Sequence, residues 1–312
     1  MATQTLAEAA KLIQNQIVQG VAEDIITTSP VWGAIPWTPY EGQAILVNRE
    51  NALGDAQNLA IGGTITAKNA ATFTQVPFSA VTVIGDAEMN GLVQAQSSGA
   101  GVNQLAIEIS SKAKSVGRLL QQGVATGTGT SPQLNSMHFL CDASQYTSAS
   151  AGQAISFALM DELLNLVKAK DGVVDFIMMP ARTIRSLKTL IRALGGITES
   201  MIYTMPNGTT RTVLQYEGIP VFQNDWLSVA ETANGAALTG GALTSVWAGV
   251  WDDGSQKLGA SMIYPAASSM GIAVEEVGVS ETKDERIVRV KSYSNFCLFN
   301  RRGLARLPSI NN

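Results

Sequence analysis

The sequence predicts an α+β fold assembled from several distinct parts. Stretches with helix periodicity and stretches with strand periodicity both occur along the 312 residues, without one regular alternation from end to end. Residues 155–265 do alternate between helix and strand patterns, which is typical of a compact α/β unit. Residues 51–71, in contrast, form a polar segment that is too long for an ordinary connection.

The chain carries unusually few charges. Its 21 Lys and Arg and 25 Asp and Glu residues make up 15% of the sequence, whereas a typical soluble protein has about 25%. With 46% hydrophobic residues and a net charge of -4, the chain is not disordered. Its pI of 5.2 excludes a strongly basic nucleic-acid binder. A monomer of this size has about 12,000 Å² of surface, and this chain has few charges with which to cover it. One solution is that copies of the chain cover one another.

The N-terminal residues predict a helix followed by an extended segment. Apolar residues recur every three or four positions over 4–26, which places them on one helix face. Two prolines then make residues 31–40 extended and irregular. Trp32, Trp37 and Tyr40 in this segment pack either on their own domain or, as an arm, on a neighbouring copy. The sequence leaves both interpretations open.

A long hairpin is expected next. Residues 43–50 and 72–84 have strand character, and residues 51–71 between them are rich in Ala, Gly, Asn and Thr. Loops of this length are usually functional or disordered. Because such a hairpin cannot form a core of its own, we expect it to lie on another surface.

The following region is expected to be helical. Asp86 is a candidate N-cap for a short helix that runs through Gln96. A long amphipathic helix is predicted over 102–122, with Gly123 as its C-terminal stop.

Residues 155–265 supply the remaining mixed pattern. The strand at 173–179 is apolar except for Asp175, so we expect it to be buried on both faces. The other predicted elements are helices at 155–170 and 181–194, a hairpin at 203–213 around Asn207-Gly208, and strands at 246–250 and 261–264.

The last 44 residues have a normal charge density and strand character. Residues 281–284 form a turn between two predicted strands, and residues 300–303 end the second. The charges form either a seam between copies or the solvated face of a hairpin.

The sequence shows no pattern for catalysis, metal binding or cofactor binding. His138 is the only histidine and lies in an apolar run, and Cys141 and Cys297 are too few for a structural zinc site. The glycine-rich stretch 123–129 lacks the Gly-Lys-Ser/Thr end of a P-loop. We therefore expect no enzyme activity and no cofactor. The sequence also predicts no membrane helix and no signal peptide, which favours synthesis in the cytoplasm.

The order of these features resembles the major capsid proteins of tailed bacteriophages, which have the Hong Kong 97-type fold. An arm and a long hairpin precede residues 85–90 and a long helix that carries Lys112-Ala-Lys114. The glycine-rich stretch resembles the turn that follows this helix in the family. The match there is partial, because Gln133-Leu134-Asn135 replaces the usual Gly-Leu and aromatic residue.

Two further segments carry the resemblance through the rest of the chain. Residues 174–180 and the helix behind them resemble the strand–helix unit of the family's axial domain, and residues 216–221 resemble the strand that follows. The resemblance implies these parts: an N-terminal arm (1–40), an extended β-hairpin loop (41–85), a peripheral domain (86–150) with the long spine helix 102–122, an α/β axial domain (151–268), and closing strands of the peripheral domain (269–312).

The resemblance implies a structural protein of the virion. Hexamers and pentamers of the chain would form an icosahedral shell around double-stranded DNA, which is bound without sequence specificity. Separate scaffolding, portal and decoration proteins are candidate partners, and no membrane is involved. The expected assembly contacts are Trp32, Trp37, Tyr40, Arg49, Glu50, Lys68, Phe73, Glu281, Lys283, Arg286, Arg301 and Arg302.

Some members of the family join their subunits through a covalent bond between a lysine and an asparagine. Lys68 is the only lysine in the extended loop, so it is the candidate for such a bond. Denaturing electrophoresis of particles would refute this hypothesis if the protein ran as a single monomer band.

Two alternatives remain. The first is the shell protein of an encapsulin-type bacterial nanocompartment, which shares the fold and encloses protein cargo. The second is an oligomeric α/β enzyme that uses residues 155–265. The contents of the particles would separate the first from a capsid, and turnover by a small discrete oligomer would favour the second.

Overall fold

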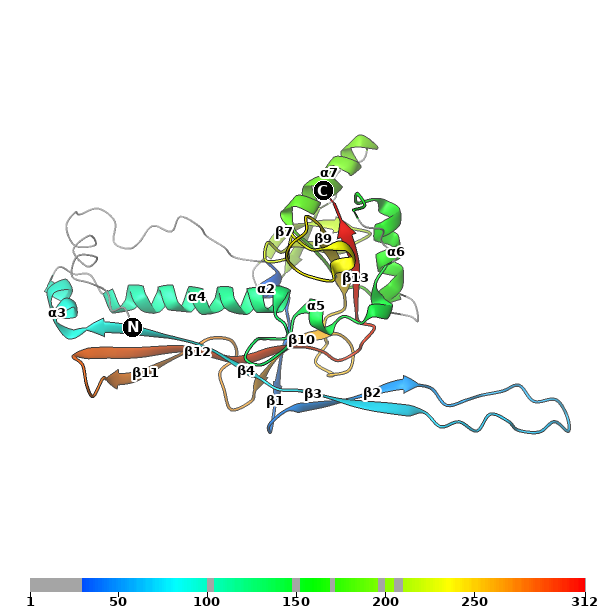
Figure 1. The fold of residues 1–312 in the computed structure, drawn as a ribbon, viewed down its shortest axis with the longest axis horizontal. Helices are drawn as coiled ribbons and strands as arrows, with labels where there is room; N and C mark the ends of the chain where they lie inside the picture. The colour runs from blue at the N-terminus through cyan, green and yellow to red at the C-terminus, as the bar shows by residue number, and fades with distance from the viewer. Residues whose placement is uncertain are drawn as a thin grey trace.

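The computed structural model describes residues 30–99, 104–147, 152–168, 172–195, 200–204 and 210–311. Two sheets and one separate hairpin organise these residues. Figure 1 shows an elongated ribbon with a helix along it on one side, a compact unit at the top, and the hairpin projecting away from both. The predicted helix at 4–26 and the turn at Asn207-Gly208 lie outside the described residues.

The first sheet forms the elongated ribbon. Its strand order is β1-β10-β12-β11, and β4 also pairs with β12. The long α4 packs along β4 and β12, and its apolar stripe provides the ribbon with a core. The elements are β1 (Trp37–Tyr40), β4 (Val81–Asn90), β10 (Ala260–Pro265), β11 (Ala273–Val279), β12 (Glu285–Leu298), α3 (Gly91–Gly99) and α4 (Gln104–Thr126).

The second sheet forms the compact unit. Its order is β13-β9-β5-β8-β7-β6, and β5 pairs in parallel with β8. The elements are β5 (Phe176–Met179), β6 (Ser200–Thr204), β7 (Thr210–Tyr216), β8 (Ile219–Gln223), β9 (Thr244–Gly249), β13 (Leu304–Ile310), α6 (Phe157–Lys168) and α7 (Ala181–Ala193).

Strand β5 is buried on both faces, which confirms the prediction for this segment. Ile177 and Met179 belong to the cluster that the sheet forms with α6 and α7. Phe176 and Met178 point to the opposite face, because successive side chains alternate across a strand. There they join a second cluster that reaches the ribbon.

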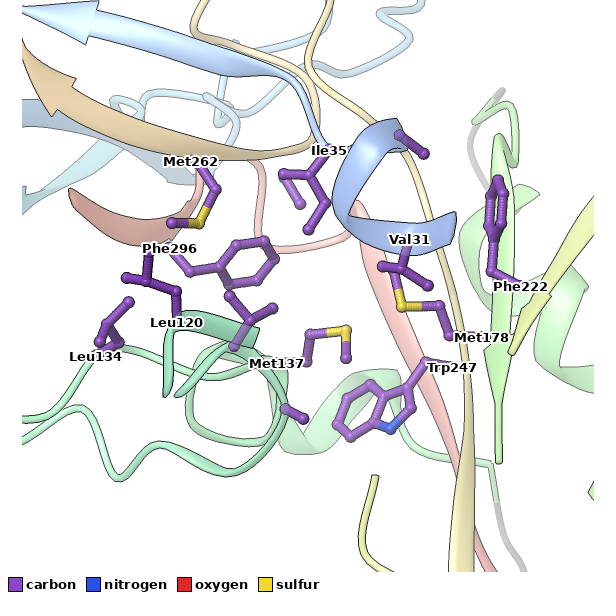
Figure 2. Close-up of a cluster of buried hydrophobic side chains, with 14 of the residues drawn as sticks. Val31, Ile35, Leu120, Leu134, Met137, Met178, Phe222, Trp247, Met262 and Phe296 are labelled. Atoms are coloured by element: carbon purple, nitrogen blue, oxygen red, sulfur yellow. The ribbon is translucent and has the colours of Figure 1, made fainter. Parts of the chain in front are cut away.

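This second cluster connects the compact unit to the ribbon. Figure 2 shows Trp247 and Met178 of the second sheet in the same core as Met262 and Phe296 of the first. The short helices α2 (Pro30–Ala34) and α5 (Met137–Leu140) add Val31 and Met137 to it, both buried. The two sheets therefore share one hydrophobic core at their junction.

The structure corrects the prediction for residues 31–40. They contain α2 and β1 rather than only irregular backbone. Strand β1 is an edge strand that pairs only with β10, so Pro39, which lacks an N–H, does not interrupt the sheet.

The predicted strand 72–84 is two strands. β3 (Thr72–Phe78) pairs with β2 (Ile45–Ala52) in the hairpin, whereas β4 leaves it and pairs with β12. Asp86 therefore lies within a strand and does not cap a helix, and the helix that follows begins at Gly91.

The predicted stop of the long helix was also wrong. α4 continues through Gly123 to Thr126. A Cβ atom at residue 123 would lie 3.1 Å from Cδ1 of Leu134, closer than an ordinary van der Waals contact. This glycine allows Leu134 to pack against the helix, and it does not terminate the helix.

The last strands divide between the two sheets. β11 and β12 belong to the ribbon, but β13 pairs with β9 in the second sheet. Conversely, β10 lies before residue 269 in the sequence but belongs to the ribbon. The predicted boundary between 268 and 269 therefore does not coincide with the boundary between the sheets.

Candidate assembly surfaces

Within the described part of the chain, the hairpin β2–β3 packs against the body at its base. Ile45, Val47, Val76 and Phe78 point to one side of the hairpin and pack against a small core that includes Phe299. Beyond these residues the hairpin extends away from both sheets (Figure 1). Its outer half therefore depends on its own backbone pairing, and a two-stranded hairpin alone is marginally stable in water.

Arg49 fixes the base of the hairpin to the end of β12. Its Nε donates to the carbonyl oxygen of Phe299 at 3.2 Å, and its Nη2 donates to the carbonyl oxygen of Leu298. Burial and the nearby guanidinium of Arg301 lower the pKa of Arg49. Arg49 therefore satisfies two main-chain acceptors and sets the direction in which the hairpin leaves the body.

The side-chain amide of Gln57 makes several hydrogen bonds within the tip of the hairpin. The Oε1 of Gln57 accepts from the backbone N–H groups of Thr66 and Ala67, both at 2.8 Å, and its Nε2 donates to the carbonyl oxygen of Thr64 at 3.1 Å. The side chain of Gln57 thus bridges the two sides of the loop where the backbone ladder has ended.

This ordered tip presents aliphatic side chains to solvent. Ile61 is fully exposed, Leu53 is 77% exposed, and Leu59 and Ile65 are about half exposed. Fully burying a Leu or Ile side chain contributes about 1.5–3 kcal/mol, so covering all four would strongly favour association. We call these four residues the apolar tip. The sequence analysis missed them, although four Leu and Ile residues in a polar loop were a visible signal.

Two expected contact residues lie on the outer hairpin. Lys68 and Phe73 are both exposed, and the ring of Phe73 lies opposite Glu50 on the neighbouring strand. Glu50 and Phe73 are on the face of the hairpin opposite to Arg49, because neighbouring residues of a strand point to opposite faces. The side chains of Arg49 and Glu50 therefore point to opposite faces of the hairpin, although the two residues are neighbours in sequence.

A groove of about 560 Å³ lies beside the base of the hairpin. It is lined by residues 45–51, Ser144, residues 256–257 and residues 299–302, so the structure brings Arg49, Arg301 and Arg302 to one place. Arg301 forms an ion pair with Asp142, and Arg302 is exposed. We call this feature the hairpin groove.

Trp32, Trp37 and Tyr40 pack against their own chain. The two tryptophan rings meet edge to face with centroids 5.5 Å apart, and Trp37 also contacts Tyr264. The hydroxyl oxygen of Tyr40 accepts from the backbone N–H of Ala80 at 3.0 Å. Of the two interpretations of this segment, the structure shows the intramolecular one for these side chains.

The far end of the ribbon carries the remaining expected contacts. Arg286 pairs with Glu276 across the strands, Lys283 pairs with Glu285 at 3.8 Å, and Glu281 is exposed. Further along the ribbon, Arg289 makes two hydrogen bonds of 2.9 Å to Asp86, and these bonds lower the pKa of that carboxyl. The sequence analysis missed this pair because strand β4 was not recognised.

A fully buried ion pair lies in the second sheet. Nη2 of Arg306 is 3.0 Å from Oε2 of Glu231, and both side chains are almost completely buried. Nε of Arg306 donates to the hydroxyl of Ser245 at 2.9 Å, and its guanidinium lies over the ring of Trp247. The arrangement gives the buried charge partners within the chain and connects β13 to β9 and the loop that precedes it.

The histidine and the two cysteines are half-buried or buried within the fold. Nε2 of His138 bonds to the carbonyl oxygen of Gly235 at 2.8 Å, and burial followed by the charge of Arg306 lowers the pKa of His138. Burial raises the pKa of Cys141 to about 12 and also raises that of Cys297. Within the described residues no group of three or more metal-ligating side chains converges. None of the described helices has both the length and the apolar character needed to span a membrane.

Solved structures of an encapsulin and of capsids resemble this chain. The SrpI encapsulin of Synechococcus elongatus PCC 7942 matches with a TM-score of 0.68 at 15% identity, over 100% of this chain and 97% of that chain. The capsid of an empty GTA particle matches with a TM-score of 0.62 at 9% identity, over 100% of both chains. The capsid of Myoviridae phage XM1 matches with a TM-score of 0.61 at 11% identity, over 94% and 96%.

These likenesses cover the whole chain and therefore show its fold. No family model and no curated protein matches the sequence. The chain has the Hong Kong 97-type fold that the order of its sequence features resembles.

Proposed function

We propose that this chain is the structural major capsid protein of a tailed bacteriophage. Copies of it assemble into hexamers and pentamers of an icosahedral shell that encloses double-stranded DNA, and it acts in the virion without catalysing a reaction. The observation that carries this proposal is the projecting hairpin, which ends in an ordered apolar tip and extends away from the rest of the described residues.

The rest of the molecule supports the same function. The fold is shared with capsid chains from a GTA particle and from phage XM1 over nearly the full length of each chain. Low surface charge favours close contact between copies, because charges that become buried are expensive to desolvate. The segments at 1–40, 41–85, 86–150, 151–268 and 269–312 remain our proposal for arm, extended loop, peripheral domain, axial domain and closing strands.

The proposed contacts form three groups. The hairpin and the hairpin groove supply Arg49, Glu50, Lys68, Phe73, Arg301 and Arg302, and the end of the ribbon supplies Glu281, Lys283 and Arg286. At the junction of the sheets, Trp32 and Trp37 pack against their own chain but keep exposed area for a contact with another copy, whereas Tyr40 is buried and would act only by supporting them. Lys68 remains the proposed site for a covalent bond between copies.

The proposal is tested by expressing the full chain and examining it by sedimentation and negative-stain electron microscopy. We expect closed particles, together with nucleic-acid absorbance when they are isolated from infected cells. Small discrete oligomers under all assembly conditions would contradict a shell function.

An encapsulin-type shell is the second candidate. It is favoured by the likeness to the SrpI encapsulin, whose TM-score of 0.68 is higher than those of the phage and GTA capsids reported above. Closed particles that contain a protein cargo and no nucleic acid would support it over the phage capsid. Absorbance at the nucleic-acid and protein maxima, followed by mass spectrometry of the contents, distinguishes the two.

A further inference from the structure

Helix α7 has an unusual charge composition. Its 13 residues include Arg182, Arg185, Lys188 and Arg192 and no acidic residue. Four of the 21 Lys and Arg residues of the whole chain are therefore on this one helix. In a protein with so few charges, this concentration indicates a specific use.

Three of these side chains form a stripe on the helix surface. At about 100° per residue, positions 185, 188 and 192 fall within an arc of about 60°, and they span about 10 Å along the axis. The opposite side of the helix carries Thr183 and Leu187, which are buried. We call Arg185, Lys188 and Arg192 the basic stripe.

The basic stripe faces away from the body of the protein. Arg185 and Arg192 are exposed and Lys188 is half-buried. Figure 1 shows that α7 extends beyond the sheet at the top of the compact unit. The stripe is therefore accessible to a large ligand.

Helix stability does not explain these cations. The N-terminal half of a helix carries partial positive charge, so Arg182 and Arg185 are unfavourably placed in the first turns of α7, and only Arg192 in the last turn is favourably placed. Arg182 donates a hydrogen bond to the carbonyl oxygen of Ala242. The positions of Arg185, Lys188 and Arg192 therefore still need an explanation.

Local carboxylates do not neutralise the stripe. Among the residues that the structure describes, no carboxylate pairs with the charged ends of Arg185, Lys188 or Arg192. The described acidic residues of the compact unit all have other interactions, and these residues are Asp161, Glu162, Asp175, Glu217, Asp225 and Glu231. A second copy therefore offers few free carboxylates from this unit.

The hairpin groove, the other concentration of cations, is different in this respect. Arg49 is bonded to two carbonyl oxygens and Arg301 is paired with Asp142, so among the described residues the groove keeps only Arg302 and Lys257 as cations whose charged ends have no hydrogen-bond or ion-pair partner. The basic stripe is thus the stronger candidate for an external anion.

We propose that the basic stripe of α7 contacts the phosphate backbone of double-stranded DNA without reading its sequence. Phosphates on one strand of B-DNA repeat every ~3.4 Å along the axis, so about 10 Å of stripe faces about three of them. Arginine and lysine are the residues that make such contacts, and contacts to phosphate carry no sequence information. This inference rests on the proposed function and identifies the surface that meets the packaged DNA.

The test measures DNA binding by the purified full-length, unassembled protein as a function of salt. The probe is a short duplex of arbitrary sequence, followed by fluorescence anisotropy between about 50 and 200 mM salt. The variant is R185Q/K188Q/R192Q, and the control K114Q/K168Q/R211Q removes the same number of charges elsewhere. Because each phosphate contact contributes about 0.9 to the slope of log affinity against log salt, we expect the variant slope to be smaller by about 2.7.

The conservative variant R185K/R192K should retain the wild-type slope, since it keeps the charges. Far-UV circular dichroism should show a folded stripe variant, because exposed substitutions usually change stability by less than about 0.5 kcal/mol. Equal slopes for the stripe variant, the control and the wild type, or no salt-dependent binding by the wild type, would overturn the proposal.

Electron microscopy of the same proteins separates this inference from the proposed function. If the wild type forms shells but the stripe variant binds DNA as the wild type does, the inference fails and the shell function stands. If the wild type forms no shells, the proposed function fails. A folded stripe variant with an unchanged slope and no assembly would show that the stripe contacts another copy of the chain, which also overturns the inference.

Discussion

Three arginine side chains show how a chain with few charges uses the charges that it has. Arg306 is completely buried and paired with Glu231, Arg49 is half-buried and bonded to two carbonyl oxygens, and Arg301 pairs with Asp142 at the surface. The effect of removing a partner should rise with burial, because a buried charge without its partner cannot be solvated.

Glu231→Gln should therefore destabilise the protein by about 3–5 kcal/mol, since it leaves the buried guanidinium of Arg306 without a counter-charge. Urea denaturation measures the change. Glu217→Gln is the matched control, because the Glu217–Lys168 pair is exposed and such pairs contribute about 0–1 kcal/mol. Equal losses for the two variants would contradict the assignment of the buried pair.

His138 should make stability depend on pH in the weakly acidic range. Burial and the charge of Arg306 lower its pKa in the folded state, so the unfolded chain takes up a proton at a higher pH than the folded chain does. Stability should be unaffected above the unfolded pKa of about 6.5 and should decrease as the pH falls below it towards the folded value.

The measurement is the urea midpoint between about pH 7.5 and pH 5.5 for the wild type and His138→Gln. The variant should show a flatter profile, because His138 is the only histidine of the chain. A wild-type profile that does not change over this range, or an identical slope in the variant, would show that His138 is not the responsible group.

At the scale of elements, the hairpin base should depend on Arg49. Arg49→Ala removes the donors to the carbonyl oxygens of Leu298 and Phe299, and hydrogen bonds from charged groups contribute about 1.5–3 kcal/mol each. We expect faster hydrogen exchange in β2 and β3 and little change in the second sheet, as measured by mass spectrometry. Glu50→Gln, on the opposite face, should leave exchange in the hairpin as it is; equal effects of both variants would refute the anchoring role.

The apolar tip should act in association and not in folding. Leu59→Asp with Ile61→Asp should leave the unfolding midpoint of the unassembled protein nearly unchanged, because both side chains are exposed. It should abolish assembly, since buried carboxylates without partners are strongly unfavourable. Analytical ultracentrifugation measures both states. Asn58→Asp with Ala70→Asp adds the same charge to the loop and should still assemble, and the hypothesis fails if the two variants behave alike.

Elements with local periodicity were predictable from the sequence. The patterns at 155–170, 173–179 and 181–194 correspond to α6, β5 and α7, because each is determined by the spacing of its own apolar residues. The division of residues 72–84 into β3 and β4 was not predictable in this way. Strand β4 is defined by its pairing with β12, about 200 positions away in sequence, and no local pattern records that partner.

At the scale of the whole molecule, the deficit of charge and the separate hairpin have one explanation. A monomer would leave the apolar tip in water, and beyond its base the hairpin extends away from the two sheets. In a shell each copy covers its neighbours, so surfaces with few charges and a preformed projecting hairpin become favourable. The sequence indicated this from composition and from the long loop, but the side chains of the tip became evident only with their exposure.

The central claim is that this hairpin is an assembly element of a shell, and a cryo-electron microscopy reconstruction of the purified assembled protein tests it most directly. We predict a closed icosahedral particle in which Leu53, Leu59, Ile61 and Ile65 of each copy are covered by another copy. Particles that are not closed shells, or a closed shell in which these four side chains remain in solvent, would contradict the claim.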